Sequence, residues 1–70
     1  MPEKIISGFK VVLHDNGKVH VSKEVGHIYV AAWKNFSYFG NAQNEYDSIK
    51  SLNSVKTFMN ASQDQYFSIR

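Results

Sequence analysis

The sequence predicts an α+β fold, in which a small antiparallel β-sheet carries one helix packed on one face. Three observations support this prediction: an Asn-Gly pair flanked by alternating apolar residues, segments of strand length between spaced glycines, and one stretch of helical periodicity near the carboxyl end. The predicted order is β-β-β-α-β. A chain of 70 residues allows one domain, so residues 1–70 are expected to form a single unit.

The clearest local signal is a hairpin over residues 9–22, with its turn at Asp15-Asn16-Gly17. A two-residue loop would mix polar and apolar side chains on both faces of the hairpin. A three-residue loop, with Gly17 in the left-handed conformation, pairs His14 with Lys18 and separates the faces. Because a slip of one residue moves every side chain to the other face, we expect the three-residue loop. It places Phe9, Val11, Leu13, Val19 and Val21 on a dry face, and Lys10, Val12, His14, Lys18, His20 and Ser22 on a solvated face.

The strands on either side of this turn are expected to cover residues 5–14 and 18–25, with a kink or bulge at Gly8. The next segment, residues 27–39, fits two structures. Its aromatic and β-branched residues favour a strand, whereas Ala31, Ala32 and the spacing of its apolar residues suit a helix. We predict a strand with a bulge or bend near Lys34-Asn35, and two shorter strands are the alternative.

Residues 40–44 have the composition of a loop, and a helix follows that begins at Asn44 or Asp47 and ends at Asn60 in the left-handed conformation. Its apolar stripe is Ile49, Leu52, Val55 and Met59, with Phe58 at the edge. Residues 65–69 are predicted to form a short last strand. The sequence leaves open which edge of the sheet this strand joins.

Composition narrows the classes of function. The net charge is only +2, and the chain has seven lysines but a single arginine. Arginine is the usual reader of guanine, so sequence-specific DNA recognition is disfavoured, whereas non-specific lysine–phosphate contact is not. No apolar leader or membrane-length segment is visible, so we expect a cytoplasmic protein with no membrane contact.

Two groups of residues are candidates for binding a partner. Lys10, His14, Lys18 and His20 form a small basic patch on the solvated face, which suits phosphates or an acidic protein surface, or else simply keeps the sheet hydrated. Two histidines without cysteine are too few ligands for a closed metal site, so no metal is expected. Tyr29, Trp33 and Tyr38 belong to a run of aromatics richer than one small face requires. Exposed aromatics stack on nucleobases or anchor protein interfaces, and buried ones fill a core.

Catalysis has no visible basis in the sequence. The carboxylates are scattered, and neither a glycine-rich phosphate loop nor a nucleophile elbow occurs. We therefore expect no enzyme and no cofactor.

The function predicted first is a non-catalytic protein-binding module that acts through a sheet face or edge. Its size and composition suggest a small accessory or inhibitory protein of a mobile element. Exposed edges and a small core also favour a homodimer. The alternative is a nucleic-acid-binding protein that uses the Lys/His face with aromatic stacking.

Overall fold

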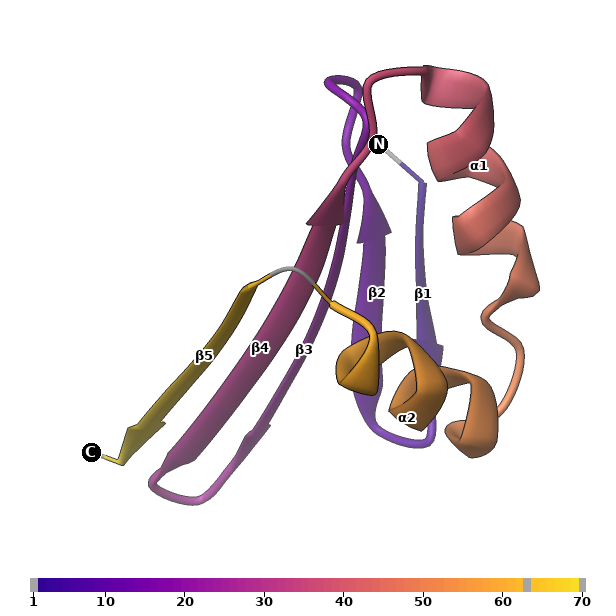
Figure 1. Cartoon of the computed structure of the whole chain (residues 1–70). Helices are drawn as coiled ribbons and strands as arrows, with labels where there is room; N and C mark the ends of the chain where they lie inside the picture. The colour runs from indigo at the N-terminus through magenta and orange to yellow at the C-terminus, as the bar shows by residue number, and fades with distance from the viewer. Residues whose placement is uncertain (1, 63, 70) are drawn as a thin grey trace.

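A computed structural model describes residues 2–62 and 64–69, and within these residues the chain forms one antiparallel sheet and two helices (Figure 1). The sheet order follows the sequence, β1-β2-β3-β4-β5, and every neighbouring pair is antiparallel. The predicted α+β class is confirmed, although the order is β-β-β-β-α-α-β. The elements are β1 (Glu3–Ile6), β2 (Phe9–Leu13), β3 (Lys18–Val25), β4 (Ile28–Asn35), α1 (Phe39–Ser48), α2 (Leu52–Asn60) and β5 (Asp64–Ile69).

The central hairpin has the predicted register. Leu13 lies opposite Val19 and Val11 opposite Val21. The His14 N–H donates to the Lys18 carbonyl at 2.9 Å, and the Gly17 N–H donates to the His14 carbonyl at 3.1 Å. Gly17 has a φ of 88°, which is the left-handed conformation that the three-residue loop requires. The separation of apolar and polar side chains between the two faces therefore fixed the pairing, as expected from the sequence.

The strand predicted over residues 5–14 is two strands. Ser7 and Gly8 have φ values of 51° and 84°, and two successive positive φ angles are characteristic of a tight hairpin turn of type I′. The chain reverses there, so that Ile6 lies opposite Phe9 and β1 becomes an edge of the sheet. The kink or bulge expected at Gly8 within one strand is therefore replaced by a hairpin turn between two strands.

The ambiguous segment, residues 27–39, is a strand from Ile28 to Asn35, as predicted, and only its last residue, Phe39, belongs to a helix. β4 pairs with β3 without interruption from Ile28 to Asn35, so the bulge predicted near Lys34-Asn35 is wrong. The alternative prediction, a bend, is met just beyond this point, because the strand ends at Asn35 and the chain bends at Ser37 and Tyr38. The loop predicted over residues 40–44 is also wrong, because α1 begins at Phe39. Gly40 and Asn41 are poor helix formers. Buried Ala42 and Tyr46 on the same helix show that packing decides the conformation there.

The single helix predicted near the carboxyl end is interrupted. Ile49 is extended, with a φ of −84° and a ψ of 101°, and α2 starts afresh after Ser51, whose hydroxyl accepts a hydrogen bond from the Ser54 N–H at 3.4 Å. Asn44 and Asp47 therefore lie inside α1 and cap nothing. Among the described residues other than glycine, only Ser7 has a positive φ, so the left-handed end predicted at Asn60 is wrong.

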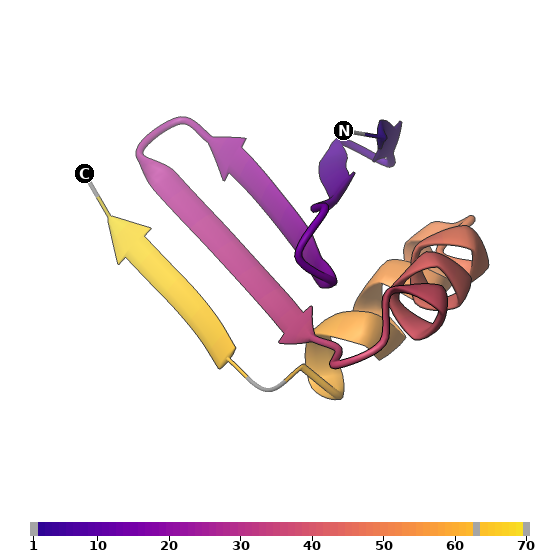
Figure 2. The same cartoon turned by 90° about the horizontal axis from the view of Figure 1, so that it is seen from above.

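The helices cover only part of one sheet face (Figure 2). They pack over β1, β2 and the parts of β3 and β4 near the β2–β3 turn, whereas the β3–β4 turn and the end of β5 extend beyond them.

The predicted dry face is confirmed, with Phe9 half-buried at its border. The predicted apolar stripe of the helical region is also confirmed, except that Leu52 is exposed and Phe58 is fully enclosed. The core consists of Val11, Leu13, Val19, Val21, Ala32, Ala42, Tyr46, Ile49, Val55 and Phe58.

Candidate functional site

The face of the sheet opposite the helices gathers most of the predicted site residues. Side chains alternate between faces along each strand, so residues of β2 and β3 that do not reach the core point the other way. They line a shallow hollow of about 380 Å³. Val12 was expected to be solvated with them, but it is buried, with only 9% of its surface exposed. The hollow is lined by Glu3, Lys10, Val12, His14, Lys18, His20 and Ser22.

Trp33 joins this group because it lies opposite His20 in the β3–β4 pairing. The two rings are stacked, with centroids 5.8 Å apart and planes at 20°. His14 meets His20 edge-on at 6.3 Å, and Lys18 Nζ lies 5.0 Å from the centroid of the Trp33 ring. We call Lys10, His14, Lys18, His20 and Trp33 the basic–aromatic face. It is built entirely on three adjacent strands, β2, β3 and β4, and on the turn between the first two.

The electrostatics of the basic–aromatic face are mildly positive. Partial burial is the main cause that lowers the pKa of His20, and the positive charges of Lys18 and His14 lower it further. Lys10 Nζ pairs with a Glu3 carboxylate oxygen at 3.5 Å, and both side chains are exposed. An exposed pair of this kind contributes about 0–1 kcal/mol. The face therefore offers a small number of cations around a half-buried indole, a setting that suits an anionic or acidic group.

The remaining two predicted anchors lie elsewhere. Tyr29 meets Tyr66 of β5 at a ring distance of 5.9 Å, farther along the helix-free face. Tyr38 is exposed just before α1. A Cβ at Gly40 would come within 2.5 Å of the Tyr38 ring, so this ring folds back over the helix start. The sequence thus predicted one group that the structure brings together and two residues that the structure separates from it.

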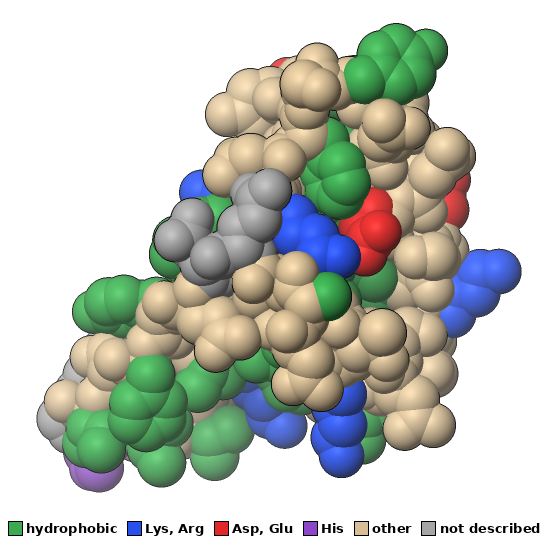
Figure 3. Space-filling model, in the orientation of Figure 1, with side chains coloured by type: hydrophobic (Ala, Val, Ile, Leu, Met, Phe, Trp, Pro, Cys, Tyr) green, Lys and Arg blue, Asp and Glu red, His purple; other side chains and the backbone are tan. Residues whose placement is uncertain are grey.

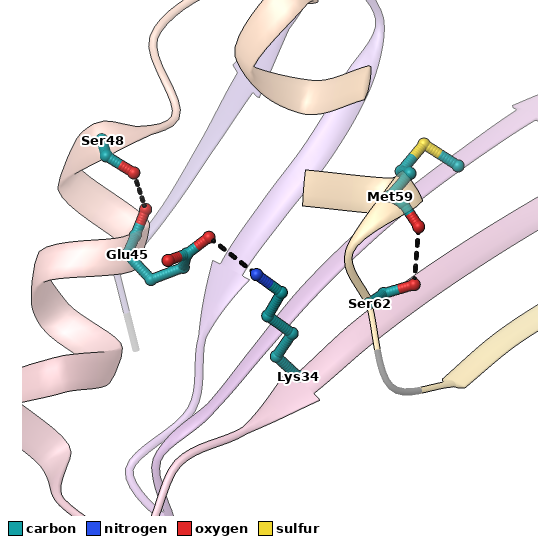
Figure 4. A network of polar contacts seen from close by, with 5 residues as sticks. All are labelled: Lys34, Glu45, Ser48, Met59 and Ser62. Atoms are coloured by element: carbon teal, nitrogen blue, oxygen red, sulfur yellow. Dashed lines mark hydrogen bonds and ion pairs between the residues drawn. The ribbon is translucent and has the colours of Figure 1, made fainter. Parts of the chain in front are cut away.

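A second hollow lies between the helices and β4 and was not predicted. Lys34 Nζ lies 3.3 Å from Glu45 Oε1, and Ser48 Oγ donates to the Glu45 carbonyl at 2.8 Å (Figure 4). The Lys34 ammonium also lies 5.1 Å from the Phe58 ring centroid. These contacts connect β4 to α1 and α2 across a hollow of about 330 Å³. Because Lys34 and Glu45 pair with each other, we interpret this hollow as a structural contact between the sheet and the helices.

A similar tie fixes the first strand to the helix layer. Lys4 Nζ donates to the Tyr46 carbonyl at 2.7 Å and lies 4.2 Å from the Tyr46 ring centroid. Burial is the main cause that lowers the pKa of Lys4 and also the main cause that raises the pKa of Tyr46. This contact holds β1 against α1.

The third surface is the part of the helix-side face that the helices do not reach. Val25 lies opposite Ile28, and Ile28 lies opposite Ile69, so the three side chains share a face, with Phe67 two residues before Ile69. Their exposed fractions are 58% for Val25, 44% for Ile28, 62% for Phe67 and 70% for Ile69. Figure 3 shows hydrophobic side chains gathered at this end of the sheet. We call these residues the open apolar end.

The sequence analysis did not predict the open apolar end as a binding surface. The strand predicted over residues 65–69 is confirmed, but the face of the sheet that the helices leave uncovered depends on sheet order and on the length of the helix layer. A usable signal was present in the excess of apolar residues at 25, 28, 67 and 69 over what one short helix covers.

The chain matches no known family model, no curated protein and no solved structure. In residues 2–62 and 64–69, no three His, Cys, Asp or Glu side chains cluster in a way that could hold a metal ion. Across that same part of the chain, no helix has both the length and the apolar character needed to cross a membrane. The case for a function therefore rests on the surfaces described above.

Proposed function

We propose that the chain is a non-catalytic protein-binding module that docks a partner on strand β5 and the open apolar end. The observation that carries this proposal is the exposure of Phe67 and Ile69 on an edge strand, beside Val25 and Ile28. Monomeric proteins rarely leave a contiguous apolar patch of this kind in water, and such patches commonly mark interaction sites. An edge strand also presents unpaired backbone groups to which an extended segment can add.

The two edges of the sheet differ in a way that supports this choice. β1 carries Glu3 and Lys4, and the carbonyl of Pro2 beside it accepts a hydrogen bond from the Leu13 N–H at 3.0 Å. Charged residues and proline are the usual means by which an edge strand resists pairing. β5 carries a charge only at its first residue, Asp64, because residues 65–69 are Gln-Tyr-Phe-Ser-Ile. The β5 edge is therefore the one that admits another strand.

Energetics favour a protein over a nucleic acid at this surface. Fully burying an exposed Val, Ile or Phe side chain contributes about 1.5–3 kcal/mol, and a polypeptide with apolar side chains can do so. A phosphate backbone would gain nothing from these side chains. A module without catalytic groups would act by occupying its partner's surface, which is the behaviour of a small accessory or inhibitory protein.

The test compares the wild-type chain with Phe67→Lys and Tyr38→Lys as baits in nuclease-treated extract of the source organism. Both positions are exposed, and only the first lies on the open apolar end. We expect the wild type and Tyr38→Lys to retain the same polypeptide and Phe67→Lys to lose it. Equal capture by all three, or loss on Tyr38→Lys alone, would contradict the proposal.

A second candidate function, nucleic-acid binding, is favoured by the basic–aromatic face. His20 and Lys18 contact the Trp33 ring, and His14 contacts His20 edge-on, on the face that carries no helix. Binding to phosphates would weaken steeply with salt. The test is a titration of Trp33 fluorescence with single-stranded oligonucleotide at two salt concentrations, using Lys18→Glu and, as a control, Lys56→Glu on α2. A signal lost with salt and with Lys18→Glu supports this function, and a flat titration removes it.

A further inference from the structure

We propose that the partner of the open apolar end is a second copy of this chain, with the two β5 strands paired antiparallel across a two-fold axis to form one continuous sheet. This inference rests on the proposed function and names the partner. Its support comes from the register of β5, from the position of α2 and from the charge along the edge.

The register follows from symmetry. When an edge strand pairs antiparallel with its own copy, the two-fold axis stands perpendicular to the sheet, and both helix layers stay on the same side. Residues that lie opposite each other point to the same face of the sheet. One residue of β5 therefore lies directly opposite its own copy, and the two-fold axis passes midway between these two residues. An axis at Phe67 pairs residues 65–69 and includes Ile69, whereas an axis at Tyr66 leaves Ile69 beyond the last pair. The Phe67 axis therefore buries more of the open apolar end.

The position of α2 explains how the uncovered face gains a cover. β5 begins beside the end of α2, where Gln65 Nε2 and Ser62 Oγ each donate to the Met59 carbonyl at 2.7 Å. The helix-bearing end of β5 is thus at Gln65, and the uncovered end is at Ile69. Antiparallel pairing places Ile69 opposite the partner's Gln65, on the same face. Each open apolar end therefore comes beside the carboxyl end of the other copy's α2, and the two copies cover each other reciprocally.

Charge and area agree with a second copy. Residues 65–69 are uncharged, so the seam itself brings no like charges together although each chain has a net charge of +2. An aromatic side chain buries roughly 150–250 Å², so the more than half-exposed Tyr66 and Phe67 of the seam supply on the order of 200 Å² per chain, to which Ile69 adds a smaller area. A standard interface buries about 800 Å² per partner, and smaller ones are weak. We therefore expect a dimer that forms at micromolar rather than nanomolar concentration.

The experiment is sedimentation velocity of the full chain from about 1 µM to about 1 mM, a range that spans weak protein interfaces. The wild type is expected to shift from monomer to dimer. Phe67→Lys and Phe67→Glu, each alone, are expected to stay monomeric, because each brings like charges together at the axis. An equimolar mixture of the two variants is expected to dimerise again, since opposite charges then face each other. Far-UV circular dichroism checks that both variants are folded.

The control is Ile5→Lys, which changes an exposed apolar residue on the other edge strand, β1, and is expected to dimerise as the wild type does. A wild type that is monomeric throughout, a dimer that persists in Phe67→Lys, or a mixture that fails to reassociate would overturn the proposal. If the wild type is monomeric while capture from the extract still depends on Phe67, the homodimer is refuted and the proposed function stands. If the wild type dimerises but captures no protein from the extract, binding of a different protein at this surface is refuted and the homodimer stands.

Discussion

Gly17 links the β2–β3 turn to the end of β4, and replacing it with alanine probes the turn directly. Its φ is 88°, and a Cβ added there would lie 2.5 Å from the Phe36 carbonyl oxygen. The Phe36 N–H in turn donates to the Gly17 carbonyl at 2.9 Å. A left-handed alanine costs about 1–2 kcal/mol. The displaced Phe36 backbone loses a hydrogen bond worth about 1 kcal/mol. We expect Gly17→Ala to lower the free energy of unfolding by about 2–3 kcal/mol.

The assay is urea unfolding followed by Trp33 fluorescence. With a slope of about 1 kcal/mol per molar urea for so small a domain, the midpoint should fall by about 2–3 M. Gly26→Ala is the matched control, because its φ of 58° imposes the same backbone cost while no atom lies within 4 Å of the added Cβ. It should lose only about 1–2 kcal/mol. Equal losses in the two variants, or an unchanged midpoint for Gly17→Ala, would refute the role assigned to the Phe36 contact.

Three further predictions concern stability. Because the folded-state pKa of His20 lies below its reference of 6.5, the unfolded chain binds more protons just below that pH, so the free energy of unfolding should decrease as the pH falls through this range. His20→Gln should flatten this dependence in urea unfolding at several pH values. Phe58→Ala should lower the free energy of unfolding by about 3–5 kcal/mol, against well under half of that for exposed Leu52→Ala. Ser51→Ala should cost about 0.5–2 kcal/mol through loss of the α2 cap, measured by the thermal midpoint.

Each of these three predictions has a contradicting outcome. A pH profile that His20→Gln leaves unchanged would show that the lowered pKa does not govern acid sensitivity. Similar losses for Phe58→Ala and Leu52→Ala would place Phe58 outside the core. A Ser51→Ala variant with the wild-type midpoint would mean that the break between α1 and α2 does not depend on this cap.

The sequence determined the hairpin because two independent constraints agreed there. The Asp15-Asn16-Gly17 turn allowed two loop lengths, and only one of them placed Leu13 and Val19 on the same face. The same parity predicted that Lys10, His14, Lys18 and His20 would share the opposite face, and the structure brings them together. Where local turn chemistry and burial point to one answer, a site can be placed without a fold template.

The errors arose where only one local signal was available. Ser7-Gly8 lacks the Asn-Gly signature, and the apolar residues on both sides of it read as one continuous strand. The stripe from Ile49 to Met59 continues in register across the break, so periodicity alone predicted one helix. Only Ser51, an N-cap with its partner three residues on, marked the second start.

The open apolar end could not be derived from local pattern. Its residues come from β3, β4 and β5, and they share a face only because β5 pairs with β4 on the side away from β1. Their exposure depends on how far the helices extend over the sheet. Both facts are properties of the assembled fold, which is why the surface that we consider most important was not among the predicted site residues.

The most direct test of this account is hydrogen–deuterium exchange of the β5 backbone amides at protein concentrations well below and well above the dimer midpoint. In the monomer, the outward-facing amides of β5 lie on an open edge, and in the dimer they pair with the other copy. We predict that β5 exchanges more slowly at high concentration while the amides of β1 exchange equally at both. Identical exchange of β5 at the two concentrations, or slowing confined to β1, would contradict it.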